Sequence, residues 1–222
     1  MAKYLLLFVF VFAFSVYAVP VQMYFNNFDG TQSYYSGYTT VTGGFSGTVS
    51  IESVGGLSGI GVTGNTFSGS YLRNSTSGNP ASTTVLTLSN LPVHDTVSIN
   101  FLLALINSWD GDASPYGPDI LNVKVNGSLV FSYNPRTYAN STALSMGSNT
   151  FNMYLENALK DIPHTASTLT VEWYASGSGW QGGADESWAI ENVQIVANIP
   201  EPGTCVLFMF AFLAFFMKKY SK

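Results

Sequence analysis

Short runs of alternating apolar and polar residues, separated by turn residues, fill the chain between residues 19 and 198. Such runs are typical of strands with one buried face, and no long stretch shows the 3.6-residue period of an amphipathic helix. Strands are predicted at residues 22–28, 45–53, 58–63, 83–89, 96–106, 120–125, 129–133, 150–155, 168–175 and 188–197. About ten short strands pack naturally as two sheets, so we expect an all-β, jelly-roll β-sandwich.

Two of these strands carry more specific signals. Residues 96–101 alternate, but residues 102–106 are apolar throughout. A strand that loses its polar face in this way is predicted to be central and covered on both faces. Asn126-Gly127 separates two alternating runs, which is a strong signal for a tight hairpin between them.

The first 18 residues have the layout of a secretory signal peptide. A basic start ending at Lys3 precedes an apolar run over residues 4–17, and small residues follow up to Ala18. We therefore expect an N-terminal signal helix over residues 1–18, cut by signal peptidase after Ala18. An uncleaved N-terminal anchor is the alternative.

A second apolar segment lies near the C-terminus, after Pro200, Glu201 and Pro202. The two prolines prevent a helix or strand from running through this point. Residues 204–217 carry no charge and have no polar face, which favours a short transmembrane helix over a buried C-terminal helix. The basic end that follows, with Lys218 and Lys219, is expected to stay on the cytoplasmic side.

This order of motif, apolar helix and basic end resembles the PEP-CTERM sorting signal of Gram-negative bacteria, over residues 199–222. The resemblance implies recognition by an exosortase, cleavage near the motif, transient anchoring in the membrane, and delivery to the cell surface or extracellular matrix. Lysine stands in the basic end where arginine is commoner in the family. The chain is thus expected to have three parts: residues 1–18, the sandwich at 19–198, and the sorting signal at 199–222.

The charge of the central part limits its partners. Residues 19–198 include twelve acidic and four basic residues. Nucleic acid is excluded as an expected partner because phosphate binding requires basic residues, whereas cations are favoured. The single cysteine, Cys205, lies in the tail, so the sandwich has no disulfide and must be held by its core.

Two acidic loops are candidates for binding Ca²⁺. Asp110 and Asp112 alternate across a glycine in a loop that residues 117–119 close, and Asp185 and Glu186 enter the last strand after a glycine-rich approach. If both loops lie at the same end of the sandwich, four carboxylates converge, and calcium takes six to eight oxygen ligands of this kind.

Asp29, at the end of the first predicted strand, is a fifth candidate ligand. The spacing of an EF-hand is absent, and the alternative is a set of solvated acidic loops without a metal. Trp109 and Trp180 are candidates for an aromatic platform that contacts a sugar ring, although tryptophans beneath loops more often belong to the core.

The segments around these loops resemble a jelly-roll module of secreted bacterial proteins over residues 71–196 and, more loosely, the sandwich of MAM and reelin-type domains. The residues that carry the resemblance are Ser108-Trp109-Asp110-Gly111, Gly117-Pro118-Asp119 and Asp185-Glu186-Ser187-Trp188. These families imply adhesion or ligand binding, often with a structural calcium. Glu191 stands where they usually have aspartate.

Signals for catalysis are weak. His94 and His164 follow prolines in similar loop contexts, which indicates a repeated turn, and the chain lacks a nucleophile elbow before a helix. The sequence therefore predicts an exported, non-catalytic binding or structural protein that acts in adhesion or exopolysaccharide assembly. A carbohydrate-binding module is the alternative, and a glycoside hydrolase that uses paired carboxylates is less favoured.

Overall fold

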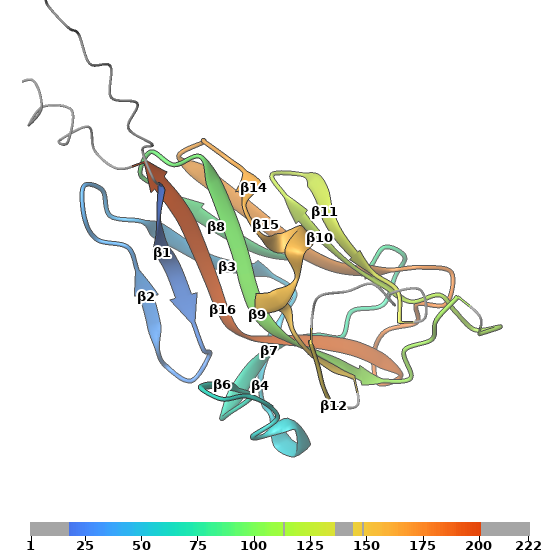
Figure 1. Cartoon of the computed structure of the whole chain (residues 1–222). Coiled ribbons are helices and arrows are strands. Elements are labelled where there is room, and N and C mark those ends of the chain that lie inside the picture. Colours follow the sequence, from blue (N-terminus) through green and yellow to red (C-terminus); the bar gives the residue numbers. More distant parts are fainter. Residues whose placement is uncertain (1–17, 113, 136–143, 148, 201–222) are drawn as a thin grey trace, which may run out of the picture. The chain divides into compact units, whose positions relative to one another are not determined.

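Two β-sheets face each other in the computed structural model and enclose the core between them (Figure 1). The structure describes residues 18–112, 114–135, 144–147 and 149–200. Pro20–Ile199 form one compact unit, and a second unit with both chain ends lies almost entirely outside the described residues. The predicted all-β sandwich is confirmed.

The larger sheet has nine strands. They are β1 (Ala18–Asn26), β2 (Gln32–Tyr34), β4 (Ser50–Ser53), β7 (Ser70–Asn74), β9 (Thr96–Asn107), β12 (Leu144–Gly147), β13 (Thr150–Asn152), β14 (Ile162–Pro163) and β16 (Glu186–Pro200). The main order is β12-β13-β9-β16-β1-β2. In addition, β14 pairs with β9, and β7 pairs with both β16 and β4.

The smaller sheet has five strands in the order β11-β10-β15-β8-β3. Their bounds are β3 (Thr42–Gly47), β8 (Thr84–Ser89), β10 (Ile120–Val125), β11 (Ser128–Tyr133) and β15 (Thr168–Ser176). A separate short hairpin consists of β5 (Gly61–Val62) and β6 (Asn65–Thr66). The described helical segments are three 3-10 turns, η1 (Gly55–Leu57), η2 (Met153–Leu155) and η3 (Asn157–Leu159).

The core between the sheets follows from strict alternation along the strands. On β15 the buried positions alternate with half-buried ones, so Val171 and Trp173 face the larger sheet. Phe101 of β9 meets the Trp173 ring edge-on, with 5.9 Å between ring centroids. Both side chains are fully buried, so this pair joins the two sheets at the centre of the core.

The outer face of the larger sheet, which points away from the smaller sheet, is partly covered. Leu102 and Ala104 of β9 pack there against Val54, Phe67 and Tyr71. The segment between β4 and β7, residues 54–69, therefore forms a small third layer over β9, which we call the covering layer. This arrangement confirms the prediction that the apolar run at residues 102–106 lies in a central strand buried on both faces.

Three strand predictions were wrong in part. The predicted strand at 150–155 ends at Asn152, where the chain enters the 3-10 turn η2. The predicted strand at 45–53 is two strands, β3 and β4, which belong to different sheets because the chain turns at Gly47, where φ is +97°. Residues 58–63 are mostly turn and the short strand β5, which belongs to the covering layer. The Asn126-Gly127 hairpin between β10 and β11 is confirmed, with φ of 46° and 79°.

The predicted signal helix at residues 1–18 and the predicted transmembrane helix at residues 204–217 lie outside the described residues, apart from Ala18, which is the first residue of β1. Within the part of the chain that the structure describes, no helix has the length and apolar character needed to cross a membrane. Both helices therefore stay predictions.

Candidate functional site

Three carboxylates meet at one end of the sandwich. One oxygen from each of Asp110, Asp119 and Glu186 lies within 4.8 Å of the other two. Glu186 is the first residue of β16 and is paired with Asn107 at the end of β9, while Asp110 follows in the next loop. Asp119 comes directly before β10, so the cluster joins elements of both sheets.

The loop from Asp110 to Asp119 is closed by its own hydrogen bonds. The Asp119 amide donates to the Asp110 carbonyl at 2.8 Å, and the Asp110 amide donates to Asp119 Oδ2. These two bonds fix the Asp119 side chain at the base of the loop through Oδ2 and leave its Oδ1 atom unused.

A glycine-rich segment packs tightly against this loop. At Gly179 a Cβ atom would lie 2.0 Å from the Tyr116 carbonyl oxygen and 2.9 Å from Asp119 Oδ1, so only glycine fits without displacing the loop. Two residues later, the Gln181 amide donates to Glu186 Oε2 at 2.7 Å. The segment therefore brings Glu186 close to Asp119 and stabilises one of its oxygens.

The cluster has unbalanced negative charge. Asp119 and Glu186 have no exposed surface, and Asp119 Oδ1 and Glu186 Oε1 lack a hydrogen-bond partner among the described residues. Burial raises the pKa of Asp119 to about 6, with a further contribution from Glu186, and burial also raises the pKa of Glu186. In the described part of the chain, the ion pair within 4.0 Å is Arg73–Glu52, which leaves the cluster without a basic partner.

The buried negative charge of such a cluster can be neutralised in two ways. A divalent cation can neutralise the carboxylates and use the two unpartnered oxygens as ligands, with Asp110, which is half-buried, on the side open to water. Alternatively, Asp119 and Glu186 can share a proton, because two close carboxylates do not ionise together readily. The donor set is all oxygen, which fits calcium better than a softer metal.

The structure brings two of the five predicted metal ligands, Asp110 and Glu186, into this cluster. Asp112 is exposed and outside it, and the exposed Asp185 accepts a hydrogen bond from Ser108 Oγ at 2.7 Å. Asp119 takes the third place. Its signal in the sequence was its position at the closure of the Asp110 loop, immediately before a strand.

Asp29, the remaining predicted ligand, lies with Glu191 rather than with the cluster. Asp29 Oδ1 accepts from the Ser70 amide, and both Glu191 oxygens accept from the Ser68 amide at 3.0 and 3.1 Å. Glu191 has no exposed surface, and burial, followed by the charge of Asp29, raises its pKa to about 8. This pair attaches the covering layer to β16 through backbone amides.

Trp109 and Trp180 pack against each other, with ring centroids 5.2 Å apart and an interplanar angle of 58°. Trp180 is 6 % exposed, so it has almost no free face on which a sugar could stack. The indole nitrogens donate to the carbonyls of Ser187 and Thr76, at 2.7 and 3.2 Å respectively. Trp180 thus packs as part of the core, whereas Trp109 is only half-buried, so its contact with a sugar stays a prediction.

His94 and His164 form a buried hydrogen-bond relay. Asn126 Oδ1 accepts from the Thr170 amide at 2.8 Å, so Asn126 Nδ2 donates to His164 Nε2 at 3.0 Å. His164 Nδ1 then donates to His94 Nε2 at 2.7 Å, and His94 Nδ1 donates to the Pro92 carbonyl at 2.6 Å. This direction makes both rings neutral Nδ1–H tautomers. The loops that carry His94, His164 and Asn126 are therefore joined by one chain of hydrogen bonds.

Replacing His164 with alanine is expected to lower the free energy of unfolding by about 1–2 kcal/mol at pH 7.5, because His94 and Asn126 lose their partner. Burial, followed by the neighbouring His94, lowers the pKa of His164, so its contribution is complete above about pH 6.5 and is lost on acidification. Urea unfolding at pH 7.5 and 5 should therefore show a smaller difference at pH 5. Thr165→Ala, at an exposed neighbour, is the control, and equal stability of the two variants would contradict the relay.

Comparisons with known proteins give little beyond the structure itself. No family model matches the chain, and no curated protein matches it. One solved structure with some likeness is the enzymatically active domain of tailspike protein 4 from bacteriophage CBA120, at 16 % identity and a TM-score of 0.34. The match covers 70 % of this chain and 19 % of the tailspike chain.

Proposed function

We propose that this chain is an exported, non-catalytic binding or structural protein of the cell surface or extracellular matrix, and that one Ca²⁺ orders the loops at one end of its sandwich. The predicted signal peptide and the PEP-CTERM-like tail of the sequence support the export and sorting, with signal peptidase and an exosortase as proposed processing partners. Adhesion or exopolysaccharide assembly is the role that fits this location.

The observation that carries the cation is the pair of unpartnered, fully buried oxygens on Asp119 and Glu186. A buried carboxylate oxygen that has no hydrogen bond, in a group without a countercharge, is costly, and a bound calcium removes that cost for both groups at once. Asp110 and backbone or water oxygens would complete the ligand set.

A hydrolase that uses these carboxylates is the less favoured function. Catalytic carboxylates must touch the glycosidic bond, whereas Asp119 and Glu186 have no exposed surface. His94 and His164 are also buried, at 1 % and 7 % exposure, and both are engaged in the relay. A binding or structural role does not require a substrate to reach these buried carboxylates and histidines.

Calorimetric titration of the full-length chain with CaCl₂, in a mild detergent and after treatment with EDTA, tests this proposal. We expect binding of one ion, lost in Asp119→Asn and Glu186→Gln because each removes a charged ligand. Asp112→Asn, in the same loop but outside the cluster, is the matched control and should bind normally. Absence of binding heat with calcium, or loss of binding in the control alone, would refute the site.

A further inference from the structure

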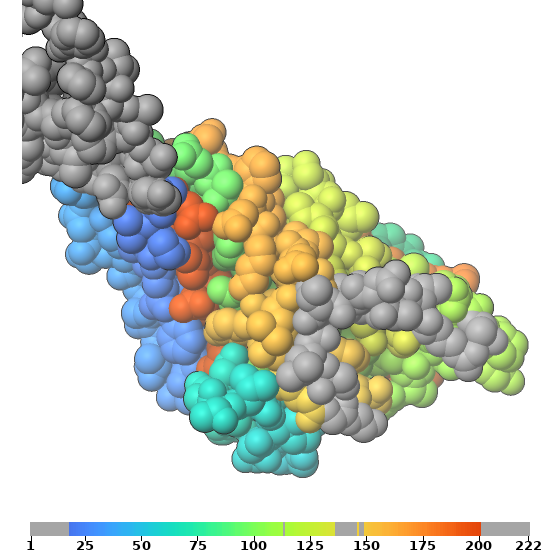
Figure 2. Space-filling model, viewed as in Figure 1, coloured from blue at the N-terminus to red at the C-terminus, as the bar shows by residue number. Residues whose placement is uncertain are grey.

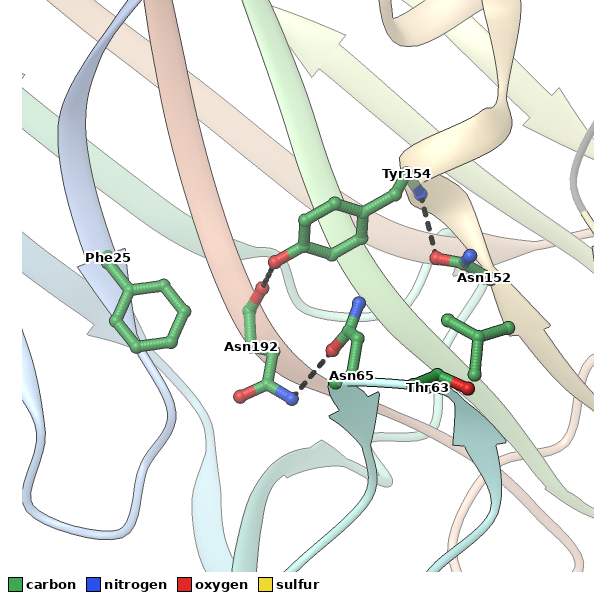
Figure 3. Close-up of a pocket in the computed structure, with 8 residues that line it drawn as sticks. Phe25, Thr63, Asn65, Asn152, Tyr154 and Asn192 are labelled. Carbon is green, nitrogen blue, oxygen red and sulfur yellow. Dashed lines mark hydrogen bonds between the residues drawn. The ribbon is translucent and has the colours of Figure 1, made fainter.

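A pocket of about 300 Å³ opens on the outer face of the larger sheet, around Asn192 in the middle part of β16, whereas the cluster residue Glu186 begins that strand. The cyan segment that contains β5 and β6 lies there beside the blue β1 and the yellow segment around β13 (Figure 2). The lining residues with aromatic or polar side chains are Phe25, Thr63, Asn65, Asn152, Tyr154 and Asn192 (Figure 3).

The pocket is organised around Asn192. This residue lies in a bulge of β16 and has a φ of +50°, after which Val193 and Ile195 point into the core, so Asn192 faces outward. Its side-chain nitrogen donates to Asn65 Oδ1 at 2.9 Å and to the Thr66 carbonyl at 3.3 Å.

Tyr154 fixes the same point from the other side. Its hydroxyl donates to the Asn192 carbonyl at 2.5 Å, and its backbone amide donates to Asn152 Oδ1 at 3.3 Å (Figure 3). The pocket wall is therefore built by hydrogen bonds before any ligand arrives, which reduces the ordering cost of binding.

Several polar groups of the pocket remain available. Both amide hydrogens of Asn192 are used, but within the described residues its Oδ1 atom has no hydrogen-bond donor. The Asn65 side-chain nitrogen and the Thr63 hydroxyl likewise have no partner there. The pocket thus offers one amide acceptor, one amide donor and one hydroxyl, which can act in either sense.

Phe25 and Tyr154 add aromatic surface to the pocket and lie on either side of Asn192 (Figure 3). No lining residue is charged. Aromatic rings suit the apolar face of a sugar ring, and neutral amides and hydroxyls suit its hydroxyl groups. An anionic sugar would instead require a basic residue, and a cationic ligand would require a carboxylate.

Amide side chains continue from the pocket along the same sheet face. Gln194, two residues after Asn192, donates to Gln22 Oε1 at 2.7 Å and accepts from Asn100 Nδ2 at 3.0 Å. A ligand longer than one sugar would therefore meet further amides next to the pocket, which favours a polysaccharide chain over a free monosaccharide.

We propose that this pocket binds an uncharged sugar residue of a polysaccharide. The proposal deepens the binding role given above and rests on that role, but it uses a part of the molecule separate from the cation cluster. Phe25 provides stacking surface, Asn192 and Asn65 pair with sugar hydroxyls, and Thr63 adds a third polar contact at the turn of the β5–β6 hairpin.

Affinity electrophoresis of the full-length chain tests the proposal, in a polyoxyethylene detergent that contains no sugar. The gels contain dextran, mannan, galactan or laminarin as neutral glycans, or alginate as an anionic one, with and without EDTA. At least one neutral glycan should retard the chain. Phe25→Ala should weaken that binding about tenfold. Asn192→Gly, which keeps the positive φ but removes the amide, should weaken it similarly.

Thr63→Val separates binding from folding, because the Thr63 hydroxyl has no internal partner to lose. It should weaken binding about fivefold with an unchanged melting temperature. Tyr38→Ala, at an aromatic residue that is 85 % exposed, is the matched control and should bind like the wild type. Failure of all four neutral glycans, retardation by alginate alone, or wild-type binding by every pocket variant would overturn the proposal. Loss of binding in EDTA would assign the ligand to the cation cluster and also overturn it.

Discussion

Removing calcium at pH 7.5 is expected to lower the free energy of unfolding of the full-length chain by about 3 kcal/mol, compared with the chain at about 100 times its Kd for calcium. The reason is that Asp119, whose pKa is raised to about 6, ionises at this pH in a site without exposed surface, so the fold carries buried negative charge beside Glu186. Urea unfolding followed by tryptophan fluorescence, in calcium and in EDTA, gives this difference directly.

Asp119→Asn makes the prediction specific, since its two expected effects have opposite signs. The variant should lose the gain from calcium, yet in EDTA it should be more stable than the wild type because one buried charge is gone. Asp112→Asn should retain the full effect of calcium.

A shared proton gives a different pattern. The pKa of Asp119 is raised to about 6 from the usual aspartate pKa near 3.8. The stabilising effect of its protonation is therefore complete below about pH 3.8 and is lost as the pH rises through about 6. On acidification from pH 7.5 to 5 in EDTA, the wild type should therefore gain more stability than Asp119→Asn, because Glu191 contributes equally to both. That additional gain, together with no effect of calcium at pH 7.5, would show that a shared proton, and not a cation, neutralises the cluster.

Raising the pH from 6.5 to 8 in the presence of calcium should cost the wild type about 2 kcal/mol of stability, and Glu191→Gln should abolish this loss. The pKa of Glu191 is raised to about 8, so the folded state keeps its proton in this range while the unfolded chain has lost it. The stability that protonated Glu191 contributes is fully present below the usual glutamate pKa near 4.5. It falls as the pH rises to about 8, the pKa in the folded state. Glutamine mimics the protonated form and can still accept from the Ser68 amide.

Denaturant midpoints at pH 6.5, 7.25 and 8 check this result. Glu172→Gln, a half-exposed change on the smaller sheet, is the control and should fall with pH as the wild type does. An unchanged slope in Glu191→Gln would mean that Glu191 is already ionised in the fold at pH 6.5.

The long strands could be predicted because their burial alternates in register with the sequence. The strand at 96–106 was predicted as central from the loss of its polar face, and Leu102 and Ala104 are indeed covered on the outer side. The covering layer itself could not be predicted, because residues 54–69 owe their structure to β9 and Glu191 rather than to a local period.

The carboxylate cluster could be predicted only in outline. Asp110 and Glu186 were expected to converge, but the choice of Asp119 over Asp112 depends on which side chain turns inward at the loop base, and this is decided by bonds such as that from the Asp110 amide. The pocket around Asn192 had no linear signal, because its residues come from β1, the β5–β6 turn, β13, η2 and β16.

The length of β16 has a mechanical consequence. This strand begins at the cluster residue Glu186, includes Asn192, and ends at Pro200, where the tail begins. Tension between a polymer held at Asn192 and an anchor on the tail would run along one strand. The bonds that pair residues 194–198 with β9 lie across that line, so they would be sheared together and would not open one after another. A pull of this kind would thus be resisted by the whole paired segment at once.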